Sequence, residues 1–295
     1  MTAATGAAVL RLATRGSALA RAQAALAVAA LGAAGGAAAE LVIVSTGGDR
    51  NQSTPIHELE GQGWFTAEIE RALLDGRADL AVHSAKDLPT ELGPGLEVAA
   101  VLARADPRDA VVTRDGGGLD SLADGATVGS SSARRAALIA DLRPGLRCVP
   151  IRGNVDTRLA KLDAGEVDGL VVAAAGLDRL GLGDRAFERL DPRRFVPAPA
   201  QGAIALEAVA GTAAAHTAAA AGDAGTALAV RTERAVLRAL GGGCLLPLGA
   251  WARLEDGRLV VSAALGVDGE VRRAELAGDP QRLEALVELV AGALG

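Results

Sequence analysis

The sequence contains few aromatic residues, cysteines and histidines. Among its 295 residues are three Phe, two Trp and no Tyr, too few rings for a platform that stacks nucleic-acid bases. The only cysteines are Cys148 and Cys244, which excludes a disulfide scaffold and a multi-cysteine zinc site. The three histidines are scattered and form no metal-ligand pattern. We therefore expect neither a nucleic-acid partner nor a bound metal.

A long, strongly hydrophobic run is also missing. The longest uncharged stretch, Ala22–Ala39, is mostly alanine and contains a glutamine and three glycines, so it is too weakly apolar for a convincing membrane span. The N-terminus lacks the basic, apolar and cleavage-site order of a secretory signal. We expect a cytoplasmic protein with no membrane partner.

The composition suits packed cores, because half of the residues are hydrophobic. The net charge is −6, so the whole molecule is not a polyanion binder. Of 30 basic residues only Lys86 and Lys161 are lysine. The length predicts two domains, or three small ones.

Short apolar runs alternate with helical patterns over most of the chain. This alternation indicates βαβ units and mostly parallel sheets, an α/β fold. The expected strands are Leu10–Thr14, Glu40–Ser45, Asp79–His83, Leu96–Leu102, Ala110–Thr113, Thr127–Gly129, Arg147–Ile151 and Gly169–Ala173. The expected helices are Ser17–Leu31, Phe65–Asp75, Ala133–Leu142, Val155–Ala164 and Thr226–Leu240. An alanine-rich patch at 213–221 is interpreted as a loop or helix filler.

Clusters of Pro, Gly and Asp at 106–109 and 197–202 suggest two chain crossings around an inserted domain. We predict a discontinuous first domain (1–103 plus 200–221), a second domain (104–199) and a third (222–295). The third is expected to hold strands Leu248–Leu254, Arg258–Leu265 and Glu270–Leu276 and a final helix, Gln281–Leu294.

Residues 130–161 are strongly basic, with seven Arg or Lys side chains and two Asp. Within them, Gly129–Arg135 follows a predicted strand and opens a helix, where capping serines and the helix dipole favour an anion. A second strand end, Ile151–Arg158, has the same basic character. Because ligands of α/β sheets lie outside the carboxyl ends of strands, these junctions predict a carboxylate or phosphate site. The alternative is an ordinary serine cap with solvated arginines.

Two further segments carry reactive side chains. Val82–Pro89 places Lys86 and Asp87 at a strand end, where they suit a zwitterion or developing charge; His83 there is more often a hydrogen-bonded core residue than a general base. The glycines before Cys244 leave its thiol unshielded, which fits a nucleophile or a covalent attachment point; a buried free cysteine is the alternative.

Eight segments, taken in order, resemble the porphobilinogen deaminase family from residue 9 to about residue 290. They are Leu12–Ser17, Asp79–Pro89, Asp106–Ala110, Val128–Arg135, Arg152–Arg158, Ala174–Gly181, Pro199–Ala203 and Gly242–Cys244. The resemblance implies three α/β domains. The first two are similar to the lobes of a type II periplasmic-binding-protein fold, and the third is a small α+β domain that carries the cofactor cysteine.

The resemblance also implies an activity. Four porphobilinogen molecules are condensed head to tail, with loss of ammonia, to hydroxymethylbilane for tetrapyrrole and heme synthesis. A dipyrromethane cofactor, bound to the cysteine by a thioether, primes the chain in a monomeric enzyme. Each porphobilinogen brings two carboxylates, which explains an arginine-rich site in an acidic protein.

By the same resemblance, Asp87 is the catalytic residue and stabilises positive charge near the pyrrole N–H groups. The residues expected to bind the cofactor are Cys244, Lys86, Asp87, Ser132, Arg134, Arg135 and Arg158. The residues expected to bind the substrate are Arg15, Ser17, Gln23, Arg152, Arg158, Arg179 and Gln201.

One loop departs from the family pattern. Glu58 and Gln62 stand where relatives often carry lysines, although Phe65 keeps the usual aromatic. Two other functions compete with the family activity. A non-catalytic two-lobed carboxylate-binding module explains the arginines but not Gly241–Cys244, and an acyl- or phospho-transfer enzyme that uses Cys244 lacks an evident histidine base.

Overall fold

The computed structural model describes residues 9–35, 38–47, 66–243 and 246–295, which fold into two compact units. The first unit contains the described residues up to 47 together with 66–103 and 203–227. The second contains 104–202 and the described residues of 228–295. The chain therefore crosses between the units after Ala103, after Gly202 and after Ala227.

The elements of the first unit are β1 (Leu10–Thr14), α1 (Ala18–Gly35), β2 (Ala39–Ile43), α3 (Ala67–Leu74), β3 (Leu80–Ser84), the 3-10 turn η2 (Ala85–Asp87), β4 (Leu96–Val101), β10 (Ile204–Val209) and α7 (Ala213–Ala219). Those of the second are β5 (Asp109–Thr113), η3 (Leu119–Ser121), β6 (Thr127–Gly129), α4 (Ala133–Leu142), β7 (Arg147–Val149), α5 (Val155–Asp163), β8 (Gly169–Ala173), α6 (Ala174–Arg179), β9 (Glu188–Arg189), most of α8 (Ala224–Ala239), β11 (Leu248–Glu255), β12 (Arg258–Val267), β13 (Glu270–Gly278), η4 (Pro280–Arg282) and α9 (Leu283–Leu294).

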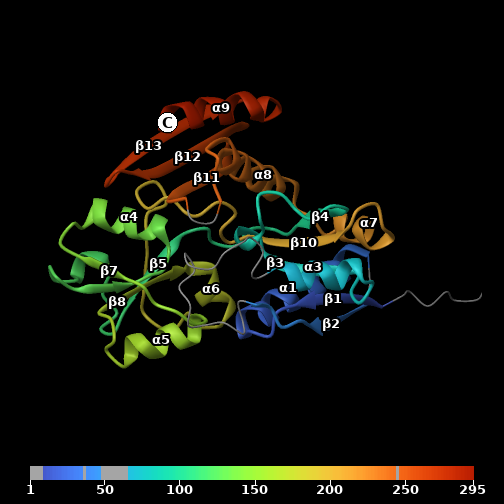
Figure 1. The fold of residues 1–295 in the computed structure, drawn as a ribbon, viewed down its shortest axis with the longest axis horizontal. Helices are drawn as coiled ribbons and strands as arrows, with labels where there is room; N and C mark the ends of the chain where they lie inside the picture. Colours follow the sequence, from blue (N-terminus) through green and yellow to red (C-terminus); the bar gives the residue numbers. More distant parts are fainter. Residues whose placement is uncertain (1–8, 36–37, 48–65, 244–245) are drawn as a thin grey trace, which may run out of the picture. The chain divides into compact units, whose positions relative to one another are not determined.

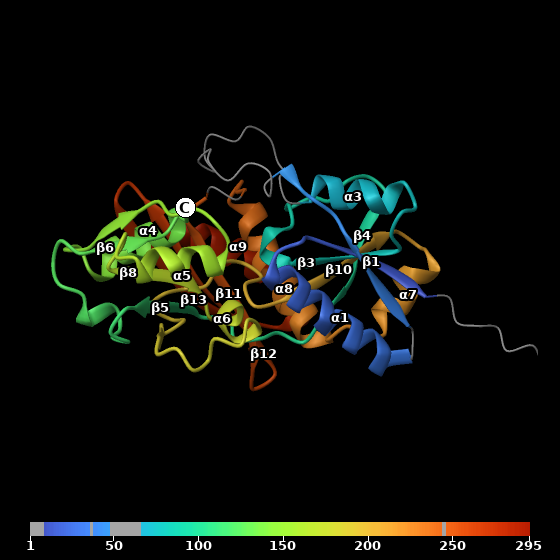
Figure 2. The same ribbon diagram turned by 90° about the horizontal axis from the view of Figure 1, so that it is seen from below.

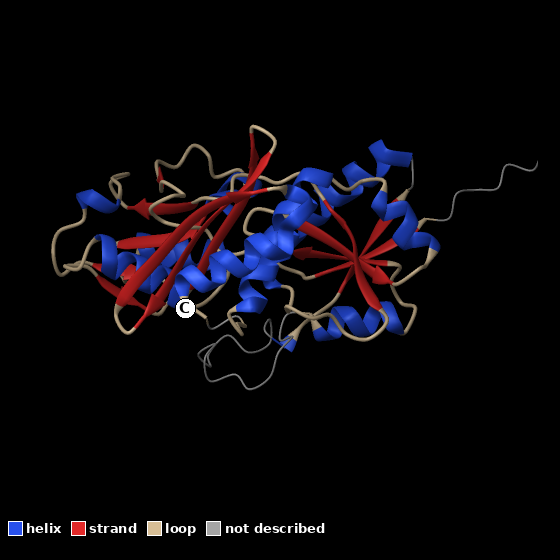
Figure 3. Cartoon of the chain, turned by 90° about the horizontal axis from the view of Figure 1, so that it is seen from above, coloured by secondary structure: helices blue, strands red, loops and turns tan. Residues whose placement is uncertain are grey.

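The first unit is a five-stranded sheet in the order β2-β1-β3-β10-β4, with helices on both faces (Figure 3). β1 pairs in parallel with β2 and β3, whereas β10 runs antiparallel to both of its neighbours. α1 buries Ala24, Ala27 and Leu31 against one face, and α3 packs on the other (Figure 2). The small side chains of α1 let the helix pack close to the sheet. This packing supports the edge of the sheet where β1 and β3 end.

The sheet of the second unit repeats this topology in the order β7-β6-β8-β5-β9. Again the parallel strands come in the order second, first, third, and the antiparallel strand beside them is the first strand after the chain enters the unit. α4 and α5 lie on opposite faces of this sheet (Figure 1). In both units the carboxyl ends of three parallel strands therefore meet at one edge, where ligands of open α/β sheets bind.

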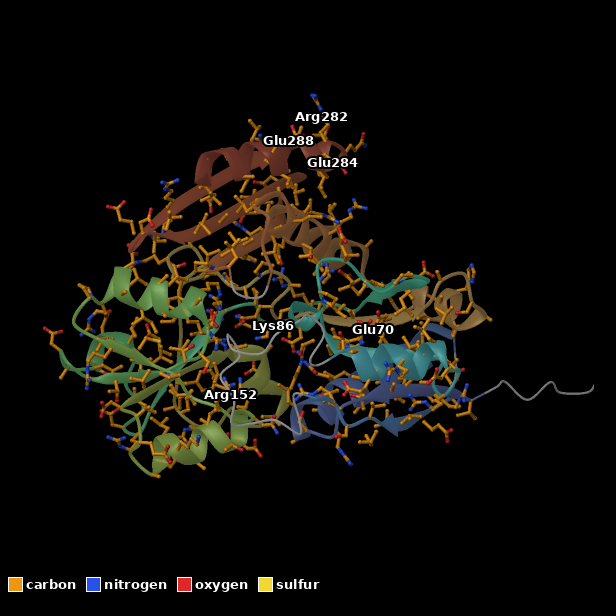
Figure 4. All side chains as sticks on the ribbon, in the orientation of Figure 1. Glu70, Lys86, Arg152, Arg282, Glu284 and Glu288 are labelled. Carbon is orange, nitrogen blue, oxygen red and sulfur yellow. The ribbon has the colours of Figure 1, made fainter. Side chains whose placement is uncertain are left out.

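A separate antiparallel sheet, β11-β12-β13, completes the second unit. α9 covers one face of it and presents Glu284 and Glu288 to solvent, next to the exposed Arg282 of η4 (Figures 1 and 4). The other face packs on the lobe around α4, where Trp251 and Ala264 join the core of Leu138 and Phe195.

The backbones in this contact approach so closely that a Cβ on Gly249 would lie 2.5 Å from the Val196 carbonyl oxygen. The α/β lobes and the small C-terminal sheet domain confirm the predicted fold class.

Most elements predicted from the sequence are present within a few residues of their expected ends. Three described elements were not expected: α6, β9 and β10. The alanine-rich patch forms a helix, α7, which is one of the two interpretations that the sequence left open. The start of the helix predicted from Phe65 falls outside the described residues.

α1 is the single described helix that is long and apolar enough to cross a membrane. It is also a packed layer of the first unit, with Ala20, Gln23, Ala24, Ala27 and Leu31 buried. Since a core helix passes the same test of length and composition, α1 is not evidence of a membrane protein.

Glu233 of α8 joins three segments of the second unit. Its carboxylate accepts two hydrogen bonds from the Arg104 guanidinium, at 2.6 and 3.1 Å, and one each from the backbone N–H groups of Ala200 and Ala252. Glu233 is fully buried, and Arg104 also donates to the Gln201 carbonyl oxygen. The chain entering the lobe, the chain leaving it and β11 are thus held by one carboxylate.

Replacing Glu233 with alanine is expected to lower the free energy of unfolding by about 3–5 kcal/mol, because it leaves a mostly buried guanidinium without its counter-charge. Urea unfolding of the intact protein measures the change. Glu284→Ala, on the exposed face of α9, serves as the control and is expected to change the free energy by less than about 0.5 kcal/mol. Equal effects of the two substitutions would contradict the assigned role of Glu233.

Candidate active site

The carboxyl edge of the first sheet collects the site residues predicted in this unit. Arg15 and Ser17 follow β1, and Ser17 caps α1 through a bond from the Ala20 N–H to its Oγ of 3.3 Å. Lys86 and Asp87 follow β3, the parallel neighbour of β1. Gln23 reaches the same edge from α1, where its Nε2 donates to Ser84 Oγ at 2.7 Å.

The turn that bears Lys86 and Asp87 is fixed by its backbone. The Ala85 N–H donates to the Ala203 carbonyl oxygen at 3.0 Å, extending the β3–β10 ladder by one residue. The ladder holds the start of the 3-10 turn, so Lys86 is half-buried while Asp87 is exposed at the sheet edge (Figure 4 labels Lys86). An exposed carboxylate on a fixed turn is suited to act on a charged ligand.

In the second unit, two βα junctions are joined by one serine. Ser131 Oγ donates to the Ile151 carbonyl oxygen at 2.8 Å and accepts from the Ile151 N–H at 3.1 Å. This places the start of α4 beside the loop that carries Arg152. Ser132 caps α4 as its position suggested, accepting from the Arg135 N–H at 3.4 Å. The two basic segments therefore do share one edge of this sheet.

Arg134 and Arg135 do not extend into solvent. Both contact Asp109 at the start of β5: Arg134 Nη1 lies 2.8 Å from one carboxylate oxygen, and Arg135 donates to the other from Nε and Nη2. They are 4% and 7% exposed, and Asp109 is fully buried. Burial lowers the pKa of the Arg134 guanidinium, although the charge of Asp109 partly offsets this. The group of three has one positive charge in excess, and Arg134 Nε has no hydrogen-bond partner among the residues that the structure describes.

The other predicted arginines of this unit lie at the same edge. Arg152 follows β7 and is half-buried; Figure 4 labels it. Arg158 donates from Nε to the Gly153 carbonyl oxygen at 2.8 Å, next to a glycine whose φ of 109° a side chain would rarely adopt. Arg179, which ends α6 after β8, donates to the Gly202 carbonyl oxygen. Burial lowers the pKa of Arg179, and within the described part of the chain its buried Nε finds no hydrogen-bond partner.

Three residues have structural roles that the sequence did not predict: Gln201, which was expected to bind substrate, and Asp109 and Glu233, which had no expected role. Gln201 is 1% exposed and its Nε2 donates to the Pro107 carbonyl oxygen, so this amide holds the chain crossing together. Asp109 and Glu233 organise arginines but received no role from the sequence. Asp109 stood inside the quoted segment Asp106–Ala110, where its only signal was a carboxylate at the start of a buried strand.

Cys244 and the loop with Glu58, Gln62 and Phe65 lie outside the described residues. The other thiol, Cys148, is half-buried on β7, and burial raises its pKa. A raised thiol pKa disfavours the nucleophilic thiolate, so Cys148 is a poor attachment point.

Comparison with known families adds the decisive observation. Residues 10–217 match the family model "Porphobilinogen deaminase, dipyromethane cofactor binding domain", and residues 227–294 match "Porphobilinogen deaminase, C-terminal domain". The chain belongs to the porphobilinogen deaminase family.

Curated proteins named porphobilinogen deaminase are similar to this chain over most of its length. The protein of Acidothermus cellulolyticus is 50% identical over 255 residues, covering 85% of this chain and 77% of its own. That of Bordetella bronchiseptica is 46% identical, covering 85% and 81%. That of Syntrophobacter fumaroxidans is 45% identical over 276 residues, covering 92% and 89%.

Among solved structures, a periplasmic substrate-binding protein of an ABC transporter from Coxiella burnetii aligns with 14% identity and a TM-score of 0.45. It covers 72% of this chain and 91% of its own.

A porphobilinogen deaminase carries a dipyrromethane cofactor, a molecule with several carboxylates, and the hydrogen-bond donors of the second unit fit such a group. The buried arginines beside Asp109 retain one excess positive charge, and among the described residues Arg134 Nε and Arg179 Nε find no hydrogen-bond partner. Buried guanidiniums with spare donors favour carboxylates over neutral ligands.

Proposed function

We propose that this protein is a hydroxymethylbilane synthase, which condenses four porphobilinogen molecules head to tail and releases ammonia at each step. The observation that carries the proposal is the match of both porphobilinogen deaminase domains, in order, along almost the whole chain. The identity of 45–50% to proteins of that name supports it. The arginine-rich edge of the second sheet supports a substrate with many carboxylates.

The roles of individual residues belong to the same proposal. Lys86, Ser132, Arg134, Arg135 and Arg158 bind carboxylates of the cofactor. Incoming substrate is bound by Arg15, Ser17, Gln23, Arg152, Arg158, Arg179 and Gln201. When bound through a thioether to Cys244, the dipyrromethane supplies the nucleophilic pyrrole that starts the chain.

Asp87 is the proposed catalytic residue. As ammonia leaves the substrate, positive charge develops and the pyrrole N–H becomes a stronger hydrogen-bond donor. A carboxylate that accepts from this N–H stabilises the charge more in the transition state than in the bound substrate, which lowers the barrier. The exposed position of Asp87 on an anchored turn suits this role.

We further propose that the protein works as a cytoplasmic monomer, in three domains with the boundaries expected from the sequence, and that it needs no nucleic acid or membrane. The packing of α1 as a core helix of the first unit supports the absence of a membrane partner.

Intact-protein mass spectrometry tests the function. Freshly purified, active protein is expected to carry an adduct of two pyrrole units that is lost in Cys244→Ser, together with all turnover of porphobilinogen. Cys148→Ser is the matched control and is expected to keep both the adduct and the turnover, because its thiol is half-buried in β7. An unmodified mass from active wild-type protein would rule out the covalent primer.

A further inference from the structure

Two ionisable side chains are buried on the α3 face of the first sheet, and the proposed reaction does not use either of them. His83 of β3 and Glu207 of β10 lie on neighbouring antiparallel strands. His83 Nε2 is 2.9 Å from Glu207 Oε2, and the side chains are 4% and 0% exposed. The sequence alone suggested a core histidine at 83 and gave no hint of its partner.

The surroundings of this pair are apolar. On the same face lie Ala13 and Ala81 from the sheet and Ile69, Ala72 and Leu73 from α3. The acidic residues of α3, Glu68 and Glu70, are not among its buried residues, and Figure 4 labels Glu70 on this helix. Although His83 Nε2 and Glu207 Oε2 are 2.9 Å apart, neither Glu207 oxygen nor His83 Nε2 forms a hydrogen bond of good geometry with any described residue.

A pair of this kind is costly for stability. Burying a carboxylate removes its hydration, and neither Glu207 oxygen receives a hydrogen bond of good geometry from a described residue in return. Apolar side chains of similar volume usually fill such a place with equal or greater stability. Packing therefore does not explain why a histidine and a glutamate stand here.

The position of the pair does offer an explanation. His83 is the last residue but one of β3, directly before the turn that bears Lys86 and Asp87. On the opposite face of the sheet, Gln23 of α1 holds the next residue, Ser84, at 2.7 Å. The end of β3 is thus held by a polar contact from each face, and α1 and α3 lie on opposite sides of it (Figure 2).

A short polar contact across strands in an apolar surrounding also fixes the distance between the strands more narrowly than apolar packing does. The 2.9 Å contact joins residues diagonal to each other in the β3–β10 register, where His83 is opposite Ala205 and Glu207 is opposite Ala81. A small displacement of the end of β3 relative to β10 would lengthen this polar contact in an apolar surrounding, whereas apolar side chains would tolerate the displacement.

We propose that His83 and Glu207 are positioning residues that fix the Lys86–Asp87 turn in the orientation needed for reaction. The inference rests on the proposed function, since it assigns the catalytic carboxylate to Asp87. Neither side chain touches substrate, because both are buried within the sheet. They act through the backbone of β3.

The test compares an isosteric variant with an apolar one. Glu207→Gln keeps the shape of the side chain and a polar contact with His83, and is expected to retain kcat within about threefold. The double substitution His83→Leu with Glu207→Met removes the contact but keeps the volume. It is expected to keep the melting temperature of the wild type or exceed it, while kcat falls about 10- to 100-fold and KM changes little.

The matched control lies at the opposite end of the same strands. Arg11 and Asp79 form a partly exposed pair across β1 and β3 at their amino ends, with Arg11 Nη2 2.7 Å from Asp79 Oδ1. Arg11→Gln with Asp79→Asn is expected to leave kcat unchanged. A fall in kcat that appears equally in this control would show a general loosening of the sheet and would overturn the proposal.

Two further outcomes would overturn it. Wild-type kcat in a folded double variant would remove any positioning role, and loss of the fold in the double variant would assign the pair to stability alone. Failure of the proposed function is a separate result, because it appears in the wild type itself as the absence of porphobilinogen consumption and of the adduct.

Discussion

Asp87→Ala is expected to lower kcat for porphobilinogen about 10²- to 10³-fold while the adduct on Cys244 is still detected by mass spectrometry. The carboxylate is exposed at the end of the turn after β3, so its removal leaves no buried group unpaired and creates no cavity. The folded state is therefore expected to keep its stability. Since the charge it opposes develops only as ammonia leaves, the loss is expected in kcat rather than in KM.

Glu91→Ala is the matched control for Asp87, because Glu91 is an exposed carboxylate four residues further along the chain. We expect it to leave kcat unchanged. Asp87→Asn separates charge from shape: it retains an oxygen that accepts a hydrogen bond, and its kcat should fall nearly as far as that of the alanine variant. Near-normal turnover in both Asp87 variants would remove Asp87 from the catalytic role.

The sequence predicts the edges of the two sheets well, because each edge is encoded locally. β1, β5, β6 and β8 coincide with short runs of apolar residues. Gly129 ends β6 and Ser130 follows it, and both residue types favour turns. A serine followed by a helical pattern is enough to place the cap at Ser132. Local signals of this type determine which residues lie at a strand end or at the start of a helix.

The contacts of those side chains were not predictable in the same way. Arg134 and Arg135 were expected to face a ligand, and the structure shows both held by Asp109, 25 residues earlier in the case of Arg134. That pairing depends on β5 running antiparallel beside β8, so that its first residue lies at the carboxyl edge of the parallel strands. Strand direction is a tertiary property, and no local pattern around Asp109 encodes it.

β10 illustrates the same limit for a whole element. Its six residues include two alanines and, near the middle, a glutamate. This composition does not favour a buried strand. Glu207 is accommodated because His83 on the neighbouring strand contacts it. The buried position of β10 and of Glu207 is therefore explained only by His83, which is more than 100 residues away in the chain.

Asp109→Asn is expected to lower the stability of the protein as strongly as Glu233→Ala does. It leaves two buried guanidiniums without a counter-charge, and breaking a buried ion pair in this way typically costs about 3–5 kcal/mol. Asparagine keeps the size of the side chain and one oxygen that accepts hydrogen bonds, so the loss reports charge rather than packing. Urea unfolding in the Cys244→Ser background measures it, since protein without the adduct has no cofactor carboxylates to replace the missing charge.

The control for Asp109 is an exposed pair in the same unit. Asp163 lies 2.5 Å from Arg185 with 54% of its side chain exposed, and Asp163→Asn is expected to cost less than about 1 kcal/mol because water screens the charges. In protein that carries the adduct, we expect the cost of Asp109→Asn to shrink, because cofactor carboxylates would then oppose the charge of Arg134 and Arg135. An equal cost with and without the adduct would contradict the assignment of these two arginines to the cofactor, while leaving their structural pairing with Asp109 intact.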